Sequence, residues 1–319
     1  VRDGPGLLLL AGIDSRPEQS RGNKDTDSLA ENFTPSGLSA MFNILIQEML
    51  LAQPDCQAVV VAKDRHLARV PRQLQRRVAF AQVQTEQDCA RQIEMVASQH
   101  PGLLVIDHLN ATTVSTAFKA AGQGVRVLAQ FDTILHGAAV LHQIIDLGIP
   151  RSELAALRWV ITMQRLPVLC SHCKRSVDLN DDLCQKVAAR YPDLREALDL
   201  IRRPVSRAAS HKTAQAQAGF FGAQGCELCH VSGYQGDIAI FDLFYNDPSS
   251  SAPLNQPSLL SLEEYALHLA HQGQIDLYDL LELDSSNLRR TYQMLTASER
   301  ALKNANTELS RKLIELEAS

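Results

Sequence analysis

GLLVIDHLNATTVSTAFKAAGQGVRVLAQFDT, residues 102–133, holds two short apolar runs on either side of a helical pattern. Leu103–Ile106 and Val125–Gln130 have the length of buried strands. Residues 111–121, which lie between them, have apolar side chains at helical spacing. A strand, a helix and a second strand in this order are typical of an α/β domain.

The same alternation extends over the rest of residues 1–150. Two further apolar runs, Leu7–Ala11 and Ala58–Ala62, come before the quoted stretch. Helical patterns occur at residues 38–51, 86–99 and 137–147. The rhythm predicts an α/β domain with a mainly parallel sheet. Residues 14–32 are polar and charged with almost no large apolar side chains, so we expect a mobile insert there.

Composition excludes several classes of protein. With 319 residues and 45% hydrophobic content, the chain can bury a sizeable core. Its net charge of −5, from 31 basic and 36 acidic residues, argues against a general nucleic-acid binder. The longest apolar run, Leu7–Ala11, is far shorter than the roughly 20 residues that span a bilayer, and no signal-peptide pattern opens the chain. We therefore expect a cytoplasmic protein, with flanking domains because the first residue is not Met.

FTPSGLSAMFNILIQEML, residues 33–50, begins like the phosphate-binding helix of a Walker A loop. Such a loop holds phosphates with backbone N–H groups and one Lys ammonium. Here Ser36 and Gly37 are followed by Leu38 in place of the Lys. Ser39 occupies the position of the magnesium-binding hydroxyl. Two interpretations are a nucleotide site and a vestigial phosphate loop on an ordinary core helix, and the missing Lys favours the second.

Four of the seven cysteines form two C-x-x-C pairs, Cys170 with Cys173 and Cys226 with Cys229. Each pair can present two thiolates, and two such knuckles close a tetrahedral structural zinc site. The alternatives are reduced pairs without metal and a redox pair. The redox alternative is disfavoured because neither pair opens a helix after a strand. The three scattered cysteines fit a reducing compartment better than a disulfide framework.

Beyond Pro150 the pattern becomes helical and carries the cysteine pairs. We expect a helical zinc-binding subdomain at residues 151–255. Residues 204–219 and 246–257 have the Ser, Ala, Pro and Gln bias of flexible connections. They separate the cysteine-bearing region from a last helical piece at residues 256–284.

Leucines recur at every seventh position of the closing segment, residues 285–319. They are Leu288, Leu295, Leu302, Leu309 and Leu316. This period predicts a left-handed coiled coil that serves as a connector. Asn306 falls on the seam, where Asn fixes a parallel dimer, whereas Glu299 weakens the seam. The alternative is a single amphipathic helix that packs on the body of the protein.

The cysteine-bearing stretches resemble a known family. GCELCHVSGYQGDIAIFDLF, residues 225–244, resembles the zinc-binding segment of type II secretion and type IV pilus assembly ATPases, in which G-C-x-x-C precedes G-Y-x-G-R-x-G-I-x-E-L. QRLPVLCSHCK (164–174) resembles their first zinc knuckle, and IIDLGIPRSELAALRWVITMQRL (144–166) resembles the helices before it. Residues 102–133 match their Walker B strand, the next helix and the histidine-box strand in order. The resemblance covers about residues 5–285 and implies a RecA-like P-loop NTPase core that forms hexamers.

The sequence departs from the family pattern at the residues that carry the chemistry of the family. Leu38 corresponds to the phosphate-loop Lys, and Asp107 to the catalytic Glu of the Walker B region. Asp132 corresponds to the His of the histidine box. Each replacement removes a group that acts on developing phosphoryl charge, and the loss of one such donor typically costs about 10²–10³ in rate. Asp107 and Asp132 can still bind a metal or act as bases, but such residues at adjacent strand ends are also common capping groups.

These observations predict a catalytically degenerate secretion or pilus ATPase domain. We expect it to act as a regulatory, docking or oligomerisation module linked to a signalling output domain. The alternative is a weakly or conditionally active assembly ATPase in which a neighbouring subunit supplies the missing cation. The expected cofactor is structural zinc, and Mg-ATP is not expected. The expected partners are proteins of a pilus, secretion or signalling system and further copies of the chain, as a dimer through the coil or a hexamer, with no nucleic acid and no transmembrane segment.

Overall fold

The computed structural model describes residues 4–12, 37–63, 70–177, 181–191, 194–195, 198, 220–250, 253–281 and 283. The expected insert at residues 14–32, Ser36 of the phosphate loop and the expected coiled coil at residues 285–319 lie outside the described residues.

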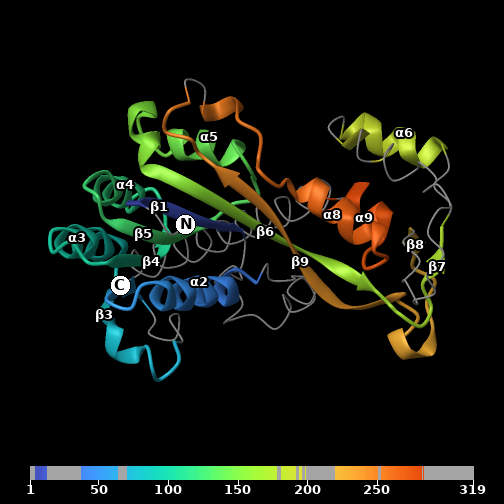
Figure 1. Ribbon diagram of the computed structural model, residues 1–319, viewed down its shortest axis with the longest axis horizontal. Helices are drawn as coiled ribbons and strands as arrows, with labels where there is room; N and C mark the ends of the chain where they lie inside the picture. Colours follow the sequence, from blue (N-terminus) through green and yellow to red (C-terminus); the bar gives the residue numbers. More distant parts are fainter. Residues whose placement is uncertain are drawn as a thin grey trace, which may run out of the picture.

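A seven-stranded mixed sheet forms the centre of the protein, with strand order β3-β2-β4-β5-β1-β6-β9 (Figure 1). All neighbouring pairs are parallel except the edge strand β9, which runs antiparallel to β6. The strands are β1 (Gly6–Gly12), β2 (Ala58–Ala62), β3 (Val78–Gln82), β4 (Leu103–Leu109), β5 (Arg126–Asp132), β6 (Leu157–Leu169) and β9 (Tyr234–Tyr245). The predicted α/β class with a mainly parallel sheet is confirmed.

Helices cover both faces of this sheet, which explains why its strands read as continuous apolar runs. One face packs against α2 (Leu38–Ala52) and is called the α2 face below. The other packs against α3 (Glu86–Ala97), α4 (Val114–Gly122) and α5 (Ala139–Asp146). Alternate residues of β1 enter the two buried clusters, as strand geometry requires.

The helical pattern expected beyond Pro150 is wrong for the first part of that region. Arg151–Ala156 forms a short 3-10 helix, η5, and Leu157–Leu169 forms the 13-residue strand β6. This strand pairs with β1 on one side and with β9 on the other, from Trp159 opposite Tyr245 onward. The physical reason is that partners far away in the sequence supply its hydrogen bonds. A local apolar pattern cannot anticipate such partners.

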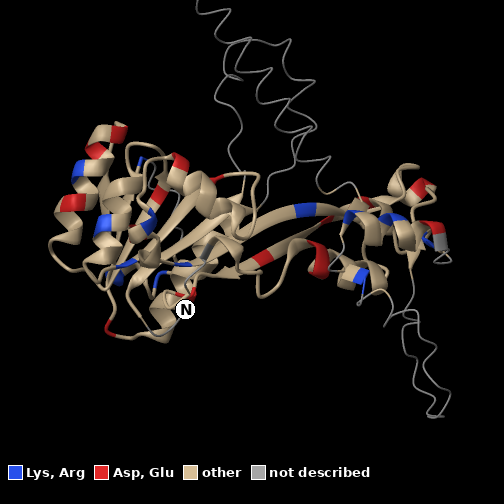
Figure 2. Cartoon of the chain, turned by 90° about the horizontal axis from the view of Figure 1, so that it is seen from above, with Lys and Arg blue, Asp and Glu red and all other residues tan. Residues whose placement is uncertain are grey.

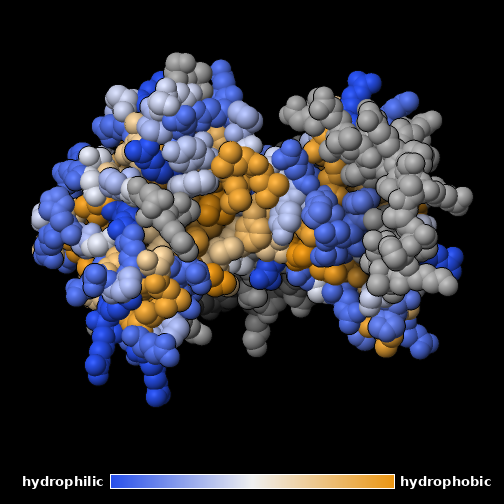
Figure 3. All heavy atoms as spheres, in the orientation of Figure 1, coloured by the Kyte–Doolittle hydropathy of each residue, from blue (hydrophilic) through white to orange (hydrophobic). Residues whose placement is uncertain are grey.

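β6 and β9 continue past the sheet as a two-stranded ribbon that carries a smaller lobe (Figures 1 and 2). The lobe contains α6 (Asp181–Arg190), α8 (Leu262–His271) and α9 (Leu277–Leu281). It also contains the short strands β7 (Arg175–Ser176) and β8 (Phe221–Gly222). A third buried cluster joins ribbon residues such as Leu166 and Ile240 to these helices. Figure 3 shows the two lobes side by side with a notch between them on this face.

Two short 3-10 helices complete the lobes, η4 (Gln75–Arg77) in the larger and η7 (Glu227–Cys229) in the smaller. Another 3-10 helix, η8 (Pro253–Asn255), lies beside α5. No helix in the described part of the chain is long and apolar enough to cross a lipid bilayer.

Candidate functional site

The four cysteines of the two C-x-x-C pairs meet at the tip of the ribbon. Cys170 follows the end of β6, and Cys229 ends η7 just before β9. The Cys170–Cys226 and Cys173–Cys229 sulfur distances are 3.9 and 3.8 Å, and all four sulfurs lie within 4.8 Å of one another. Tetrahedral zinc with bonds of about 2.3 Å puts its sulfur ligands about 3.8 Å apart. The cluster therefore has the spacing of a Cys₄ metal site.

Backbone N–H groups support the second knuckle. The N–H groups of Cys226 and Gly233 donate hydrogen bonds to the Cys229 sulfur at 3.1 and 3.2 Å. Burial raises the pKa of the Cys229 thiol, but these donors outweigh it and lower the pKa to about 6. Burial raises the pKa of Cys173 to about 11. One thiolate thus forms readily, and a bound metal would hold the remaining thiols deprotonated.

Glycine is required at two positions of this knuckle. Gly233 has φ 80°, and a Cβ there would lie 2.7 Å from that of Ala223. Gly225 has φ 96°, and a Cβ there would lie 2.5 Å from the Val231 carbonyl oxygen. Both the left-handed backbone and the close approach exclude a side chain. These glycines let the chain turn tightly enough to bring its second pair of sulfurs to the first.

The first knuckle is tied to the helices of the smaller lobe. The Lys174 ammonium donates to the Gly273 carbonyl at 2.6 Å and lies 4.7 Å from the centre of the Phe221 ring. The Leu169 N–H donates to the Gln274 carbonyl at 2.8 Å. A metal in the cluster would therefore hold both strands of the ribbon, at their cysteine-bearing tip, next to the turn between α8 and α9.

α2, the helix expected to follow a phosphate loop, starts at Leu38, and Gly37 precedes it in the left-handed conformation with φ 85°. The Leu38 side chain is only 1% exposed and packs in the cluster on the α2 face. The position that the sequence analysis matched to the phosphate-loop Lys is thus part of the hydrophobic core. Ser39 lies in the first turn of the same helix.

A cation that the sequence analysis missed lies against Gly37. A Cβ placed on Gly37 would be 3.0 Å from Nη2 of Arg165. Arg165 is on β6, two and four residues after Met163 and Ile161, which pack on the α2 face. The Arg165 guanidinium makes no hydrogen bond or ion pair within the part of the chain that the structure describes. The strand period of β6 is the signal that could have located it, and that segment was expected to be helical.

Asp107 and Asp132 lie near the carboxyl ends of the adjacent parallel strands β4 and β5. The register sets Asp132 beside Gly12, the last residue of β1, after which the phosphate-loop segment begins. Nδ1 of His108 is 3.9 Å from Oδ1 of Asp132, and both side chains are partly exposed. Both carboxylates therefore lie at the carboxyl-terminal edge of the sheet, where α2 also begins.

A buried acid that the sequence analysis did not single out lies on β9. Asp242 is 1% exposed and accepts hydrogen bonds from the Gly137 N–H at 3.1 Å and the Ser258 hydroxyl at 2.8 Å. Nδ1 of His136 lies 3.8 Å from its carboxylate, and Nε2 of the same ring lies 3.7 Å from Glu263. Asp242 thus ties the segment after β5 to the edge strand and to the segment before α8. The sequence signal that could have identified Asp242 is an acidic residue within the apolar run of β9.

Comparison with known proteins gives a family match over most of the chain. The profile of the family described as "Type II/IV secretion system protein" matches residues 34–287. None of the curated proteins matches the chain significantly.

Solved structures show weaker likeness. The ATPase DotB of Legionella pneumophila has 12% identity and a TM-score of 0.48, covering 90% of this chain and 62% of its own. The pilus retraction motor PilT with bound ADP has 14% identity and a TM-score of 0.46, covering 88% of this chain and 62% of its own. The VirB11 ATPase of Brucella suis has 12% identity and a TM-score of 0.33, covering 50% and 44%. The chain thus spans about three fifths of the length of the first two.

Proposed function

The chain belongs to the family of type II/IV secretion system proteins, and from this premise we propose that it is a member that does not hydrolyse ATP and acts as a regulatory, docking or oligomerisation module. The observation that carries the proposal is Leu38. Its side chain is buried in the core at the position where the resemblance expects the Lys that holds β- and γ-phosphates. An apolar side chain in the core offers no charge to a phosphoryl group.

The first test is ATP turnover. Purified protein with Mg-ATP is expected to show no steady-state hydrolysis above a blank without enzyme, because the phosphate-loop cation is missing and Asp132 replaces the histidine-box His. Phosphate release measured on the wild type and on Asp107→Asn checks this. Turnover that disappears in Asp107→Asn would show that the strand edge is catalytic, and the proposal would then be wrong.

A second candidate function is a weakly or conditionally active ATPase that powers pilus or secretion assembly, and Arg165 favours it. Its guanidinium lies against Gly37 and has no partner within the described residues, so a cation is available from the same chain as well as from a neighbouring subunit. An arginine pairs with phosphate oxygens in a bidentate way.

Calorimetric titration with Mg-ATP separates the two candidates. Under the leading proposal the wild type and Arg165→Gln behave alike. Under the second, the wild type binds Mg-ATP and Arg165→Gln loses most of that affinity. Arg151→Gln is the matched control, because that exposed arginine opens η5, away from Gly37.

We further propose that Cys170, Cys173, Cys226 and Cys229 hold one structural zinc ion. The sulfur spacing, the N–H donors to Cys229 and the all-thiolate ligand set support zinc over hard cations, which prefer oxygen ligands. A four-thiolate shell leaves no open coordination position, so the ion would stabilise the tip of the ribbon rather than take part in a reaction.

The remaining parts of the proposal concern organisation and partners. We place a degenerate RecA-like core at residues 1–150, the zinc-binding subdomain at 151–255, a helical piece at 256–284 and a coiled-coil connector at 285–319. The proposed location is the cytoplasm, and the proposed partners are proteins of a pilus, secretion or signalling system. Self-association through the coil would give a dimer, whereas association through the core would give a family-like hexamer.

A further inference from the structure

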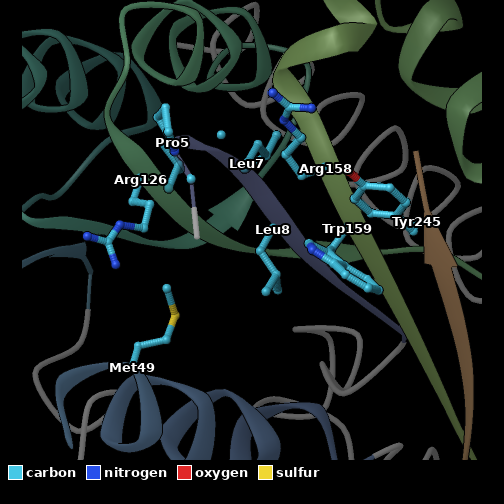
Figure 4. A pocket seen from close by; sticks show the side chains of 11 residues that line it. Pro5, Leu7, Leu8, Met49, Arg126, Arg158, Trp159 and Tyr245 are labelled. Carbon is cyan, nitrogen blue, oxygen red and sulfur yellow. The ribbon is translucent and has the colours of Figure 1, made fainter. Parts of the chain in front are cut away.

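A cavity of about 340 Å³ opens at the amino-terminal edge of the sheet (Figure 4). It lies where β1, β5 and β6 begin, with Gly6, Arg126 and Arg158 among the residues around it. The phosphate-loop segment leaves β1 at the opposite, carboxyl-terminal edge. The cavity is therefore separate from the strand edge discussed above.

Two arginines flank a strip of backbone without a side chain in this cavity. Arg126 on β5 pairs directly with Gly6 on β1, and a Cβ on Gly6 would lie 2.6 Å from Cγ of Arg158 on β6. Strands are spaced about 4.8 Å apart, so the two arginine backbones lie about 10 Å from each other across Gly6. Both side chains are long enough to reach one group between them. The absent side chain of Gly6 leaves room for the Arg158 side chain, whose Cγ and Nε lie close to that position.

The charge of these arginines is not neutralised within the cavity. No acidic residue of the described part of the chain lines it. Neither guanidinium makes a side-chain hydrogen bond or ion pair with any residue that the structure describes. The charge of Arg158 has only a small effect on the pKa of Asp247, which is lowered chiefly by hydrogen bonds from Ser249. An anion in the cavity would meet two available cations.

Next to Arg158, the wall of the cavity is aromatic and apolar. Trp159 on β6 faces Tyr245 on β9, with ring centres 4.8 Å apart and planes inclined by 47°. Leu8 and Met49 also line the cavity, and in Figure 4 both rings lie beside Arg158, on the side away from Arg126. A planar ring can pack on such a wall while an attached anion reaches the guanidinium groups.

We propose that this cavity binds a small planar aromatic phosphate monoester of the size of a nucleoside monophosphate. A phosphate monoester carries close to two negative charges and three acceptor oxygens, which matches two guanidinium groups better than a single carboxylate does. Ligand cavities span about 300–1,000 Å³, so a volume near the lower end fits one ring system with its phosphate. This site lies beyond the proposed function and does not depend on it.

The chain offers a direct readout, because Trp159 is its single tryptophan. Titration of the full chain with AMP, GMP, CMP and UMP, with indole excited where nucleotides do not absorb, reports on this cavity alone. We expect a saturable change in fluorescence with at least one of the four below about 1 mM. The matching nucleoside and inorganic phosphate are each expected to bind roughly tenfold or more weakly. No saturable change with any monophosphate, or equal affinity for nucleoside and monophosphate, would overturn the proposal.

Substitutions locate the binding. Arg126→Gln and Arg158→Gln are each expected to weaken binding of the monophosphate roughly tenfold, whereas Arg126→Lys, which keeps the charge but loses the bidentate pairing, is expected to weaken it less. Arg72→Gln is the control, because Arg72 is exposed and does not line the cavity. Unfolding midpoints of all variants are compared with the wild type, and unchanged binding in both folded glutamine variants would contradict the site. If a glutamine variant does not fold, the comparison of nucleoside with monophosphate on the wild type decides.

Discussion

Individual side chains determine the surroundings of the two ends of α2. At its start, Gly37 carries no side chain, the Leu38 side chain is buried, and the Arg165 guanidinium of β6 lies against Gly37. At its end, the Arg77 guanidinium donates to the carbonyl oxygens of Leu50, Gln53 and Cys56. Carbonyls at a helix end have no partner within the helix, and a cation there also interacts favourably with the helix dipole. Arg77 is therefore the residue that holds the carboxyl end of α2 in place.

Arg77→Ala is expected to lower the free energy of unfolding by about 1–3 kcal/mol, because it leaves several partly buried carbonyls without their donor. Denaturant unfolding followed by circular dichroism measures the change. Arg76→Ala serves as the control, since Arg76 is exposed in the same short helix η4 and is expected to change stability by less than about 0.5 kcal/mol. Equal effects of the two substitutions would mean that the hydrogen bonds of Arg77 do not stabilise the fold.

Cys226→Ser is expected to abolish stoichiometric zinc binding and to destabilise the smaller lobe by about 3 kcal/mol or more, because structural zinc contributes its binding free energy to folding. Elemental analysis of reduced protein and thermal unfolding measure both effects. Cys184→Ala is the matched control for zinc content, since Cys184 is buried in α6 and lies outside the cluster. A wild type without zinc, or a variant that retains it, would refute the assignment.

At the scale of elements, β6 and β9 determine the shape of the molecule. Their pairing runs from Trp159 opposite Tyr245 in the sheet to Leu169 opposite Tyr234 at the cysteine cluster. The two strands therefore belong to both lobes. Asp242 anchors β9 where it leaves the sheet, through hydrogen bonds from the segments after β5 and before α8.

Asp242→Asn is expected to destabilise the protein by about 1–3 kcal/mol, because the side chain then keeps one acceptor oxygen in place of two for the Gly137 N–H and the Ser258 hydroxyl. Unfolding in urea gives the value. Asp237→Asn, an exposed position on the same strand, is expected to be nearly neutral. A similarly small effect at both positions would show that Asp242 does not anchor the strand.

On the scale of the whole molecule, the larger lobe has two buried clusters, one on each face of the sheet, and the smaller lobe has a third, in which α8 and α9 pack against the ribbon. The segment at residues 285–319 lies outside the described residues, so its role remains a prediction from its leucine period.

Removal of residues 285–319 is expected to convert a dimer into a monomer, because leucines at heptad spacing bury area only against a partner helix. Light scattering gives the mass of both proteins. Zinc content and the melting of the remaining chain are expected to stay nearly unchanged, which controls for damage to the lobes. A truncated chain that remains a dimer or forms hexamers would place the assembly surface in the two lobes.

The sequence by itself determined the features that depend on neighbours along the chain. The apolar runs of β1, β2, β4 and β5 were found within three residues of their ends, as were most bounds of α2, α3, α4 and α5. The four cysteines were paired correctly into one candidate cluster, because two C-x-x-C spacings require only local turns.

Only the tertiary structure decided β6 and β9, the position of Arg165 against Gly37 and the meeting of Arg126 with Arg158 across Gly6. Each of these depends on which strands become neighbours in the sheet and in which register. Hydrophobic periodicity records which face of a segment is buried and not which distant segment buries it. Long-range pairing therefore overrode the helical pattern after Pro150, and it brought together charges that are far apart in the sequence.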